Sequence, residues 1–255
     1  MDLELKDRAF LITGGTDGLG LALAKKLVSE GAHVAVCGRD RQRLDEAQTI
    51  LGGEALCFEA DVTREGELDE FIAATLARFT RLDGAVNNAG RSAGSPVATS
   101  DDQAWRDDYE LKVIAALHMS RAVLPALESS KGALLNVLAI MARSPQANST
   151  PTTASRAAGL ALTKAMAHEV GPRGVRVNAV LIGLIESGQW VRAAHEAKMD
   201  LDDFYERMAK GSAIPLGRIG RAEEFADLAA FLLSPRASYI TGVGVSIDGG
   251  LSPVI

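Results

Sequence analysis

The amino-acid sequence predicts an α/β protein built on a doubly wound parallel sheet. Seven short apolar runs alternate with segments of helical periodicity, and the connections between the runs are longer than ten residues. Because parallel strands cannot be joined by tight turns, this alternation requires helices that cover both faces of the sheet. No repeat or low-complexity linker interrupts the pattern, so we expect residues 1–255 to form one domain.

The predicted strands are β-branched and apolar runs that suit burial on both faces of a sheet. In chain order they span residues 9–13, 34–37, 55–58, 84–86, 133–138, 175–181 and 243–247. Amphipathic periodicity predicts helices between them, over residues 19–29, 41–50, 67–79, 104–127, 152–170 and 222–233.

One irregular region, about 185–215, lies between the sixth and seventh predicted strands. It mixes aromatic residues and methionines with charges. Open α/β sheets bind ligands beyond the carboxyl ends of their strands, so we expect a substrate lid here; the alternative is an ordinary pair of surface helices.

Charge and hydropathy narrow the classes of partner. The chain has 27 Lys and Arg against 33 Asp and Glu, a net charge of −6, which disfavours nucleic acid and anionic membranes. Its longest apolar stretches, residues 132–142 and 177–185, are about half the length of a membrane span. Residues 1–8 carry acids and have no signal-peptide core. We therefore expect a cytoplasmic protein with a small-molecule substrate.

Cysteine and histidine do not form a metal-binding pattern. The two cysteines have no CxxC spacing and lie in apolar runs, where a buried thiol acts as a small hydrophobe. The histidines are scattered, without HxxxH or HExxH spacing, so we expect no metal site. These residues are Cys37, Cys57, His33, His118, His168 and His195.

The glycine-rich run TGGTDGLG, residues 13–20, follows the first predicted strand and opens the first helix. Its glycines let the backbone turn tightly and approach a pyrophosphate, whose charge meets the amides of the helix N-terminus. This placement predicts a dinucleotide site.

The end of the second strand indicates which dinucleotide. NAD-selective sites usually place an acid there, whereas this chain has Cys37, Gly38 and Arg39. Arg39 could pair with a 2′-phosphate, so NADP is favoured over NAD, although Asp17 in the glycine turn weighs against a phosphate. Alternatively, Arg39 is a plain surface residue.

From about residue 5 to residue 250 the chain resembles the short-chain dehydrogenase/reductase family. The glycine run, Asp61-Val62, the NNAG at 87–90, VRVNA at 175–179 and residues 218–250 resemble its motifs in the family's order. The resemblance implies a single Rossmann-type domain with strand order 3-2-1-4-5-6-7. It also implies cofactor contacts at Gly14, Thr16, Gly18, Leu19, Gly20, Arg39, Asp61, Val62, Asn88, Ala89, Gly90, Arg156, Gly183, Ile185 and Ser187.

The resemblance fails at the catalytic positions. The family uses Ser, Tyr and Lys, and here Ala139 stands at the Ser, Thr152 at the Tyr and Arg156 at the Lys. In this family an Asn on a helix completes the proton path, and its position falls near Glu110. An alkyl hydroxyl is a far weaker acid than a phenol, and Arg stays protonated, so the family's mechanism cannot operate unchanged. Other nearby donors are Glu110, Tyr109, Ser155, Ser92 and Ser187.

Residues 149–153, next to the altered catalytic positions, also predict the start of a helix. Thr150 suits an N-cap and Pro151 the first helical position. Amides, the hydroxyls of Thr152 or Thr153, and Arg156 could then form an anion pocket. Alternatively, Thr150 only caps, Thr152 and Thr153 face solvent, and Arg156 only replaces the ribose-binding Lys.

Three functions fit these features. The first is an NADP-dependent oxidoreductase with a non-standard proton donor, and its candidate catalytic residues are Thr152, Arg156 and Glu110. The second is a non-redox enzyme that uses the anion pocket to stabilise an oxyanion. The third is a catalytically silent, cofactor-binding subunit. The resemblance also implies a homodimer or homotetramer formed through the helices at 104–128 and 152–170, or a hetero-oligomer with an active relative.

Overall fold

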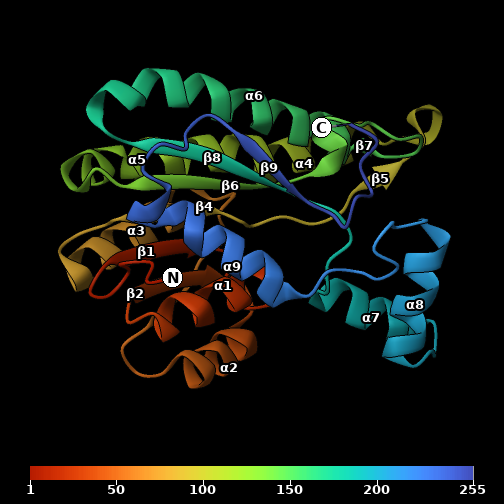
Figure 1. Ribbon diagram of the computed structural model, residues 1–255, viewed down its shortest axis with the longest axis horizontal. Coiled ribbons are helices and arrows are strands. Elements are labelled where there is room, and N and C mark those ends of the chain that lie inside the picture. The colour runs from red at the N-terminus through yellow and green to blue at the C-terminus, as the bar shows by residue number, and fades with distance from the viewer. Residues whose placement is uncertain (255) are drawn as a thin grey trace.

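A computed structural model describes residues 1–254 (Figure 1). Its main sheet has seven strands in the order β3-β2-β1-β4-β6-β8-β9, and every neighbouring pair is parallel. Counting only these strands, the order is the predicted 3-2-1-4-5-6-7, which confirms the Rossmann-type α/β fold. The strands are β1 (Ala9–Thr13), β2 (His33–Gly38), β3 (Leu56–Glu59), β4 (Gly84–Asn87), β6 (Ala133–Ala139), β8 (Arg176–Ile182) and β9 (Gly244–Ile247).

Helices cover both faces of this sheet and create two apolar cores. Alternate residues of β1 point to opposite faces: Phe10 and Ile12 pack with α1 and α9, and Leu11 packs with α3 and α5. Figure 1 shows α1, α2 and α9 on one side of the sheet and α4, α5 and α6 on the other. These helices are α1 (Gly18–Ser29), α2 (Arg41–Leu51), α3 (Glu65–Phe79), α4 (Asp102–Tyr109), α5 (Ala115–Ser130), α6 (Thr152–Val170) and α9 (Ala222–Leu233).

The helix expected over 104–127 is divided. A π-helical turn, Glu110–Ile114, joins α4 to α5. A π turn closes i→i+5 hydrogen bonds in place of the i→i+4 bonds of the α-helix. Lys112 in this turn is buried, whereas Glu110 is exposed.

A second, two-stranded sheet was not predicted. Its antiparallel strands β5 (Gly94–Ser95) and β7 (Thr150–Pro151) join the loop after β4 to the start of α6. The Thr150 hydroxyl donates to the Ser95 carbonyl, so Thr150 is not available as a helix cap. The expectation that Thr150 caps the helix is therefore wrong: α6 begins at Thr152, its N-cap position is Pro151, and no side chain caps it.

The region 185–215 forms α7 (Gly188–Glu196) and α8 (Leu201–Gly211). Figure 1 places both helices beyond the carboxyl end of β8. A small apolar cluster that includes Ala209, Ile214 and Ile219 holds α8 against the segment that leads to α9.

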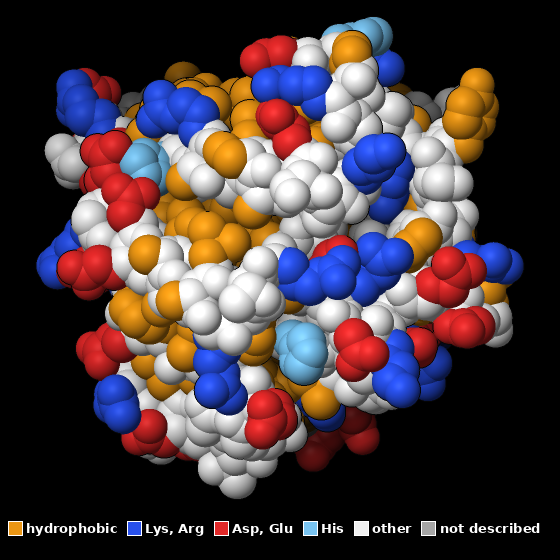
Figure 2. All heavy atoms as spheres, turned by 90° about the vertical axis from the view of Figure 1, so that its left-hand side faces the viewer, with side chains coloured by type: hydrophobic (Ala, Val, Ile, Leu, Met, Phe, Trp, Pro, Cys, Tyr) orange, Lys and Arg blue, Asp and Glu red, His pale blue; other side chains and the backbone are white. Residues whose placement is uncertain are grey.

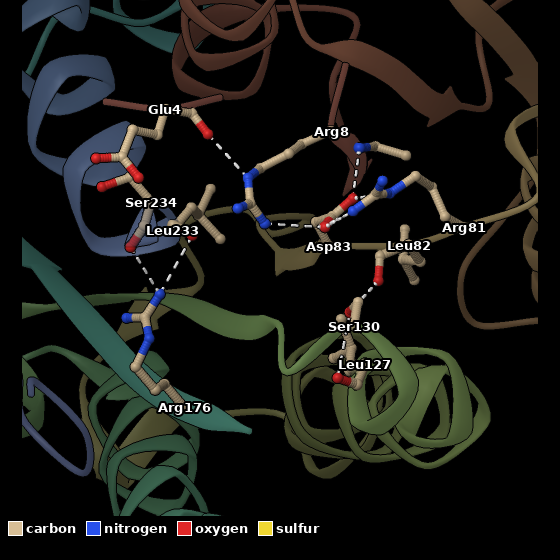
Figure 3. Close-up of polar contacts among 11 residues, drawn as sticks. Glu4, Arg8, Arg81, Leu82, Asp83, Leu127, Ser130, Arg176, Leu233 and Ser234 are labelled. Atoms are coloured by element: carbon tan, nitrogen blue, oxygen red, sulfur yellow. Dashed lines mark hydrogen bonds and ion pairs between the residues drawn. The ribbon is translucent and has the colours of Figure 1, made fainter. Parts of the chain in front are cut away.

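Buried charge organises the amino ends of the strands, on the side away from α7 and α8. Figure 3 shows Arg8 and Arg81 converging on Asp83, which is 2% exposed. The Asp83 carboxylate also accepts a 2.9 Å hydrogen bond from the Ala9 amide, which ties β1 to the start of β4. Arg176 donates to carbonyls at the end of α9, where the helix dipole favours a cation.

Figure 2 shows the surface of this same side. Lys and Arg side chains are interspersed there with Asp and Glu side chains and with small apolar areas. Within residues 1–254, none of the helices has the length and apolar character that a membrane crossing requires.

Candidate functional site

Loops at the carboxyl ends of β1 and β4 are tied together by side chains. The Asn88 side-chain amide donates to the carbonyls of Thr13 and Gly14, each at 2.9 Å. In return, the Thr13 hydroxyl accepts from the amides of Asn88 and Ala89, each at 3.1 Å. These bonds fix the cleft between the two loops, at the strand edge where parallel sheets bind ligands.

Glycine is required at this cleft because backbone approaches backbone. A Cβ on Gly20 would lie 2.4 Å from the Gly14 carbonyl oxygen, and Gly14 and Gly18 have φ values of +65° and +52°. Asp17 caps α1 by accepting from the Gly18 amide at 2.7 Å. The first turn of α1 therefore presents amides and the positive end of its dipole toward the cleft, a suitable environment for a pyrophosphate.

Arg39 and Asp61 lie 3.2 Å apart beyond β2 and β3. Burial opposes ionisation of Asp61, but hydrogen bonds from Thr63 and Arg39 outweigh it and hold the Asp61 pKa below its usual range. Arg39 is 70% exposed, so this ion pair is weak and leaves the guanidinium free to bind an anion. Thr16 packs against Gly38 beside it.

Asp17 is surrounded by arginines. Arg43 lies 3.8 Å and Arg192 3.3 Å from its carboxylate. The acid that weighed against a phosphate in the sequence is therefore offset by two cations. Because Arg192 belongs to α7, this contact also attaches the expected lid to the glycine loop.

Thr152 lies in a polar site that the sequence did not reveal. Its hydroxyl oxygen accepts hydrogen bonds from Lys112 Nζ and from the Ala93 amide, each at 2.9 Å. Thr152 is 4% exposed, so the expectation that it faces solvent is wrong. Thr153 is also buried and shares a hydrogen bond with Ser149.

Lys112 forms an ion pair with Asp108 inside the protein. The two side chains are 0% and 1% exposed, and Asp108 also accepts a 2.6 Å hydrogen bond from the Ser155 hydroxyl. Burial and the charge of Arg156 outweigh the attraction of Asp108 and lower the Lys112 pKa to about 8. At neutral pH this site therefore holds an ammonium that gives up its proton far more readily than a surface lysine.

Arg156 lies between this cluster and the cleft. Its Nη1 donates to the Val137 carbonyl at 2.6 Å, and a Cβ on Gly90 would lie 2.8 Å from its Nη2. Burial lowers the Arg156 pKa to about 10, so the group stays charged at neutral pH. Its buried Nε has no hydrogen-bond partner among the described residues.

Ser187 provides a second buried polar atom without a partner in the described chain. Its Oγ is buried. Ser187 lies beside the glycine loop, because a Cβ added to Gly18 would be 3.5 Å from the Ser187 Cβ. Buried polar groups without partners are rare in folded proteins and mark places where a ligand can bind. Arg156 Nε and Ser187 Oγ flank the two loops of the cleft, so the residues present fit a bound dinucleotide.

Apart from Arg156, which lies on α6, the predicted cofactor contacts share one edge of the sheet because each follows the carboxyl end of a parallel strand. Ile185 and Val62 are buried, and Gly183 packs against Asp248. The residues lie after β1 (Gly14, Thr16, Gly18, Leu19 and Gly20), β2 (Arg39), β3 (Asp61 and Val62), β4 (Asn88, Ala89 and Gly90) and β8 (Gly183, Ile185 and Ser187).

The predicted catalytic residues are not all brought together. Thr152 and Arg156 share the buried cluster, and Ala139 ends β6. Glu110 is exposed and its side chain makes no hydrogen bond or ion pair within residues 1–254. Lys112, two residues later, is the side chain of this turn that contacts Thr152.

Of the other donors considered, Ser155 is bonded to Asp108, Ser92 is exposed, and Tyr109 stacks on Trp105. Asp108 and Lys112 were missed altogether. A signal did exist, because an Asp–Lys pair four residues apart continues the spacing of Ala115, Met119 and Val123, which are buried along α5.

No cluster of three or more His, Cys, Asp or Glu residues that could hold a metal ion occurs within residues 1–254.

Comparison with known proteins gives consistent matches. The family model described as enoyl-(acyl carrier protein) reductase matches residues 14–252. A probable 2,4-dienoyl-CoA reductase from Bacillus subtilis is 33% identical over 253 residues, covering 96% of this chain and 97% of the relative.

Two solved structures are also similar. The NADPH-bound short chain oxidoreductase from Pseudomonas aeruginosa PAO1, described as containing an atypical catalytic center, has a TM-score of 0.92 and 37% identity, covering 97% of this chain and 98% of that chain. The L-sorbose reductase from Gluconobacter frateurii, complexed with NADPH and L-sorbose, has a TM-score of 0.94 and 29% identity, covering 100% of both chains.

Proposed function

This chain belongs to the short-chain dehydrogenase/reductase family, and from that premise we propose that it is an NADP(H)-dependent oxidoreductase. It would reduce a carbonyl group of a small molecule, or oxidise the corresponding alcohol. The observation that carries the proposal is the fixed cleft between the β1 and β4 loops, flanked by the unpaired Arg156 Nε and Ser187 Oγ. When bound, the nicotinamide cofactor supplies the hydride.

The chain's own residues suit this cofactor. The glycine turn and the amides at the start of α1 would hold the pyrophosphate. Asp61 and Val62 would contact the adenine, Arg156 a ribose hydroxyl, and Ser187 the carboxamide. The remaining predicted contacts, Gly183, Ile185 and the residues of the NNAG loop, would form the walls.

We assign NADP rather than NAD on charge. Arg39 is exposed, has only a weak ion pair with Asp61, and lies at the end of β2, where a 2′-phosphate would be recognised. Arg43 lies nearby, and its contact with the Asp17 carboxylate is long, at 3.8 Å. Two guanidinium groups without a strong partner support a site for a dianion.

The proton donor in this proposal is not the family's tyrosine. Thr152 stands there, Arg156 replaces the lysine and Ala139 the serine, so another group must supply the proton. The alternative that Arg156 and the threonines form only an anion pocket, in a non-redox enzyme, is less well supported. The Thr153 amide is already bonded to Ser149, and the Thr153 hydroxyl is occupied as well.

Two further features belong to the same proposal. Residues 185–215 would act as a lid, supported by the contact of Arg192 in α7 with Asp17 in the glycine loop. The chain would assemble as a homodimer or homotetramer, as its family generally does; light scattering after size-exclusion chromatography measures this directly.

The test is turnover of NADPH by the purified protein. With a panel of aldehydes, ketones and ketoacyl thioesters, we expect NADPH absorbance to fall in the presence of at least one carbonyl compound. Substrate conversion without a change in nicotinamide absorbance would instead support the non-redox enzyme. Tight NADPH binding without any turnover, together with co-purification of a related chain, would support the silent subunit.

A control variant establishes that turnover depends on the cleft. Gly14→Val places a side chain 3.0 Å from the Ala89 backbone at a positive φ, and NADPH binding should be lost. Circular dichroism shows whether this variant is folded. Arg156→Ala should weaken NADPH binding, and an unchanged affinity and activity would remove Arg156 from the site.

A further inference from the structure

We propose that the Lys112 ammonium is the proton source of this site and delivers its proton through the Thr152 hydroxyl. The inference rests on the proposed oxidoreductase function and names the donor that function needs. The geometry that carries it is the 2.9 Å hydrogen bond from Lys112 Nζ to Thr152 Oγ1 inside a buried cluster.

The Thr152 hydroxyl is arranged as a donor. Its oxygen accepts from Lys112 Nζ and from the Ala93 amide, which occupies both of its lone pairs. Its own hydrogen has no acceptor among residues 1–254, although the residue is 4% exposed. A buried hydroxyl with two donors on its oxygen and a free hydrogen is suited to hydrogen-bond a substrate oxygen.

The proton transfer balances along this chain of atoms. As the carbonyl carbon receives a hydride, the carbonyl oxygen takes the proton of the Thr152 hydroxyl. Thr152 Oγ1 takes a proton from Lys112 Nζ in the same step, so the threonine never carries a full negative charge. Lys112 is left as a neutral amine, and water restores its proton.

Lys112 also borders a small pocket that can hold the water from which its proton is restored. The pocket has a volume of about 20 Å³, enough for one water molecule. Asn87, Asn136 and Arg156 line it together with Lys112, so a water there would find polar partners.

Lys112 is better suited to this role than the other cations of the site. The groups that face it are Asp108 on α4, Ser155 and Arg156 on α6, and Arg91 after β4. Arg156 gives up a proton with much more difficulty, and one of its NH groups is bonded to the Val137 carbonyl. Asp108 holds the ammonium in place, while burial and the nearby arginines lower the Lys112 pKa.

The experiment compares variants that separate charge, proton and hydroxyl. Lys112→Met removes the ammonium. Lys112→Arg keeps a positive charge, but its guanidinium hardly gives up a proton. Thr152→Val removes the hydroxyl and keeps the shape of the side chain. In Lys112→Met and Thr152→Val, kcat for carbonyl reduction should fall by about 10²–10⁴-fold, the typical effect of losing a positioned general acid. Thr152→Ser should recover much of the loss, and Lys25→Met, which removes an exposed lysine of α1, is the matched control.

Two readouts distinguish a proton source from a structural ion pair. The wild-type rate of reduction should fall above pH about 8, as Lys112 loses its proton. In Lys112→Arg this fall should be absent from that pH range. Without cofactor or substrate, NMR of ¹³C-labelled lysine should show one ammonium that titrates near 8 and disappears in Lys112→Met. NADPH dissociation constants should change less than about threefold in all variants, because the role assigned to these residues is in the chemical step.

The relay and the oxidoreductase function can fail separately. If Lys112→Met retains wild-type kcat and pH profile, or if the Lys112 resonance titrates above 10, the relay is wrong although the oxidoreductase function stands. If the wild type binds NADPH but reduces no carbonyl compound, the proposed function fails, and the relay fails with it.

Discussion

Lys112 Nζ donates a 2.9 Å hydrogen bond to Thr152 Oγ1, although the two residues are 40 positions apart in the chain. The family that this chain resembles places a lysine four residues after its catalytic tyrosine, on the same helix. Here the cation beside the hydroxyl comes instead from the π turn between α4 and α5, on the neighbouring helix. The pairing of a hydroxyl with an ammonium is therefore present, but the two groups are supplied by different elements.

Cofactor selectivity should depend on Arg39. In Arg39→Ala, NADPH affinity should fall by about tenfold, the loss expected for one charge-assisted hydrogen bond to the 2′-phosphate. NADH affinity should stay within a factor of about two, because NADH lacks this phosphate. Fluorescence titrations with both nucleotides measure the difference, and equal losses would remove the assignment of NADP.

The pH dependence of reduction should move when Asp108 is neutralised. The charge of Asp108 raises the Lys112 pKa, against the larger effects of burial and Arg156, and the balance lies at about 8. In Asp108→Asn the ammonium loses that support, so its pKa must fall and the rate should begin to decline at a lower pH than in the wild type. A pH–rate profile measured at saturating NADPH checks the direction. A shift toward higher pH contradicts the assignment.

Stability should depend on Asp83 at the opposite edge of the sheet. Its buried carboxylate holds Arg8, Arg81 and the Ala9 amide (Figure 3). Asp83→Ala leaves the buried Ala9 amide without its partner, whereas Arg8 and Arg81 are 31% and 50% exposed and can be solvated, so the change should cost about 1–3 kcal/mol of unfolding free energy. Urea denaturation measures the loss. As a control, Glu54→Gln alters an ion pair whose carboxylate is 93% exposed and should change stability by less than about 0.5 kcal/mol.

Acid should selectively weaken the start of α9. Glu224 accepts from Arg218 and from the Arg221 amide, which lowers its pKa to about 2. A carboxylate with a depressed pKa stabilises the fold above its unfolded pKa, about 4.3, and loses this contribution as the pH falls toward its folded value. Glu224→Gln should therefore be less stable than the wild type by about 1 kcal/mol at pH 7, and the gap should close between pH about 4 and 2. Thermal melts across this range test the trend, and a gap that does not change with pH would contradict it.

Most of the fold could be predicted from the sequence because strand and helix periodicities are local. The apolar runs and the turn residues between them mark β1 and α6 to the residue, and the family motifs give the strand order. The division of the long helix at Glu110–Ile114 could not be predicted in this way. A π turn changes hydrogen bonding without breaking the amphipathic pattern, so periodicity alone does not detect it.

The catalytic side of the site was predicted less well for a related reason. Thr152 and Arg156 lie one turn apart on α6, and the family motifs locate both. Lys112, in contrast, contacts Thr152 only because the helices pack together. Glu110 is exposed, whereas Lys112, two residues later, is buried, because two positions along a helix are enough to turn a side chain from solvent to the interior. Pairing of β5 with β7 likewise involves residues distant in sequence and removed Thr150 from its expected role as a cap.

A crystal structure of the NADPH complex would test the dinucleotide site and the Lys112–Thr152 relay together. We predict that Arg156 Nε and Ser187 Oγ both gain hydrogen-bond partners from the nucleotide. We also predict that the Lys112–Thr152 hydrogen bond persists and that Thr152 is the nearest protein hydroxyl to the carbon that gives up hydride. A tyrosine brought in from elsewhere to that position, or a cleft closed by side chains so that no nucleotide enters, would contradict these predictions.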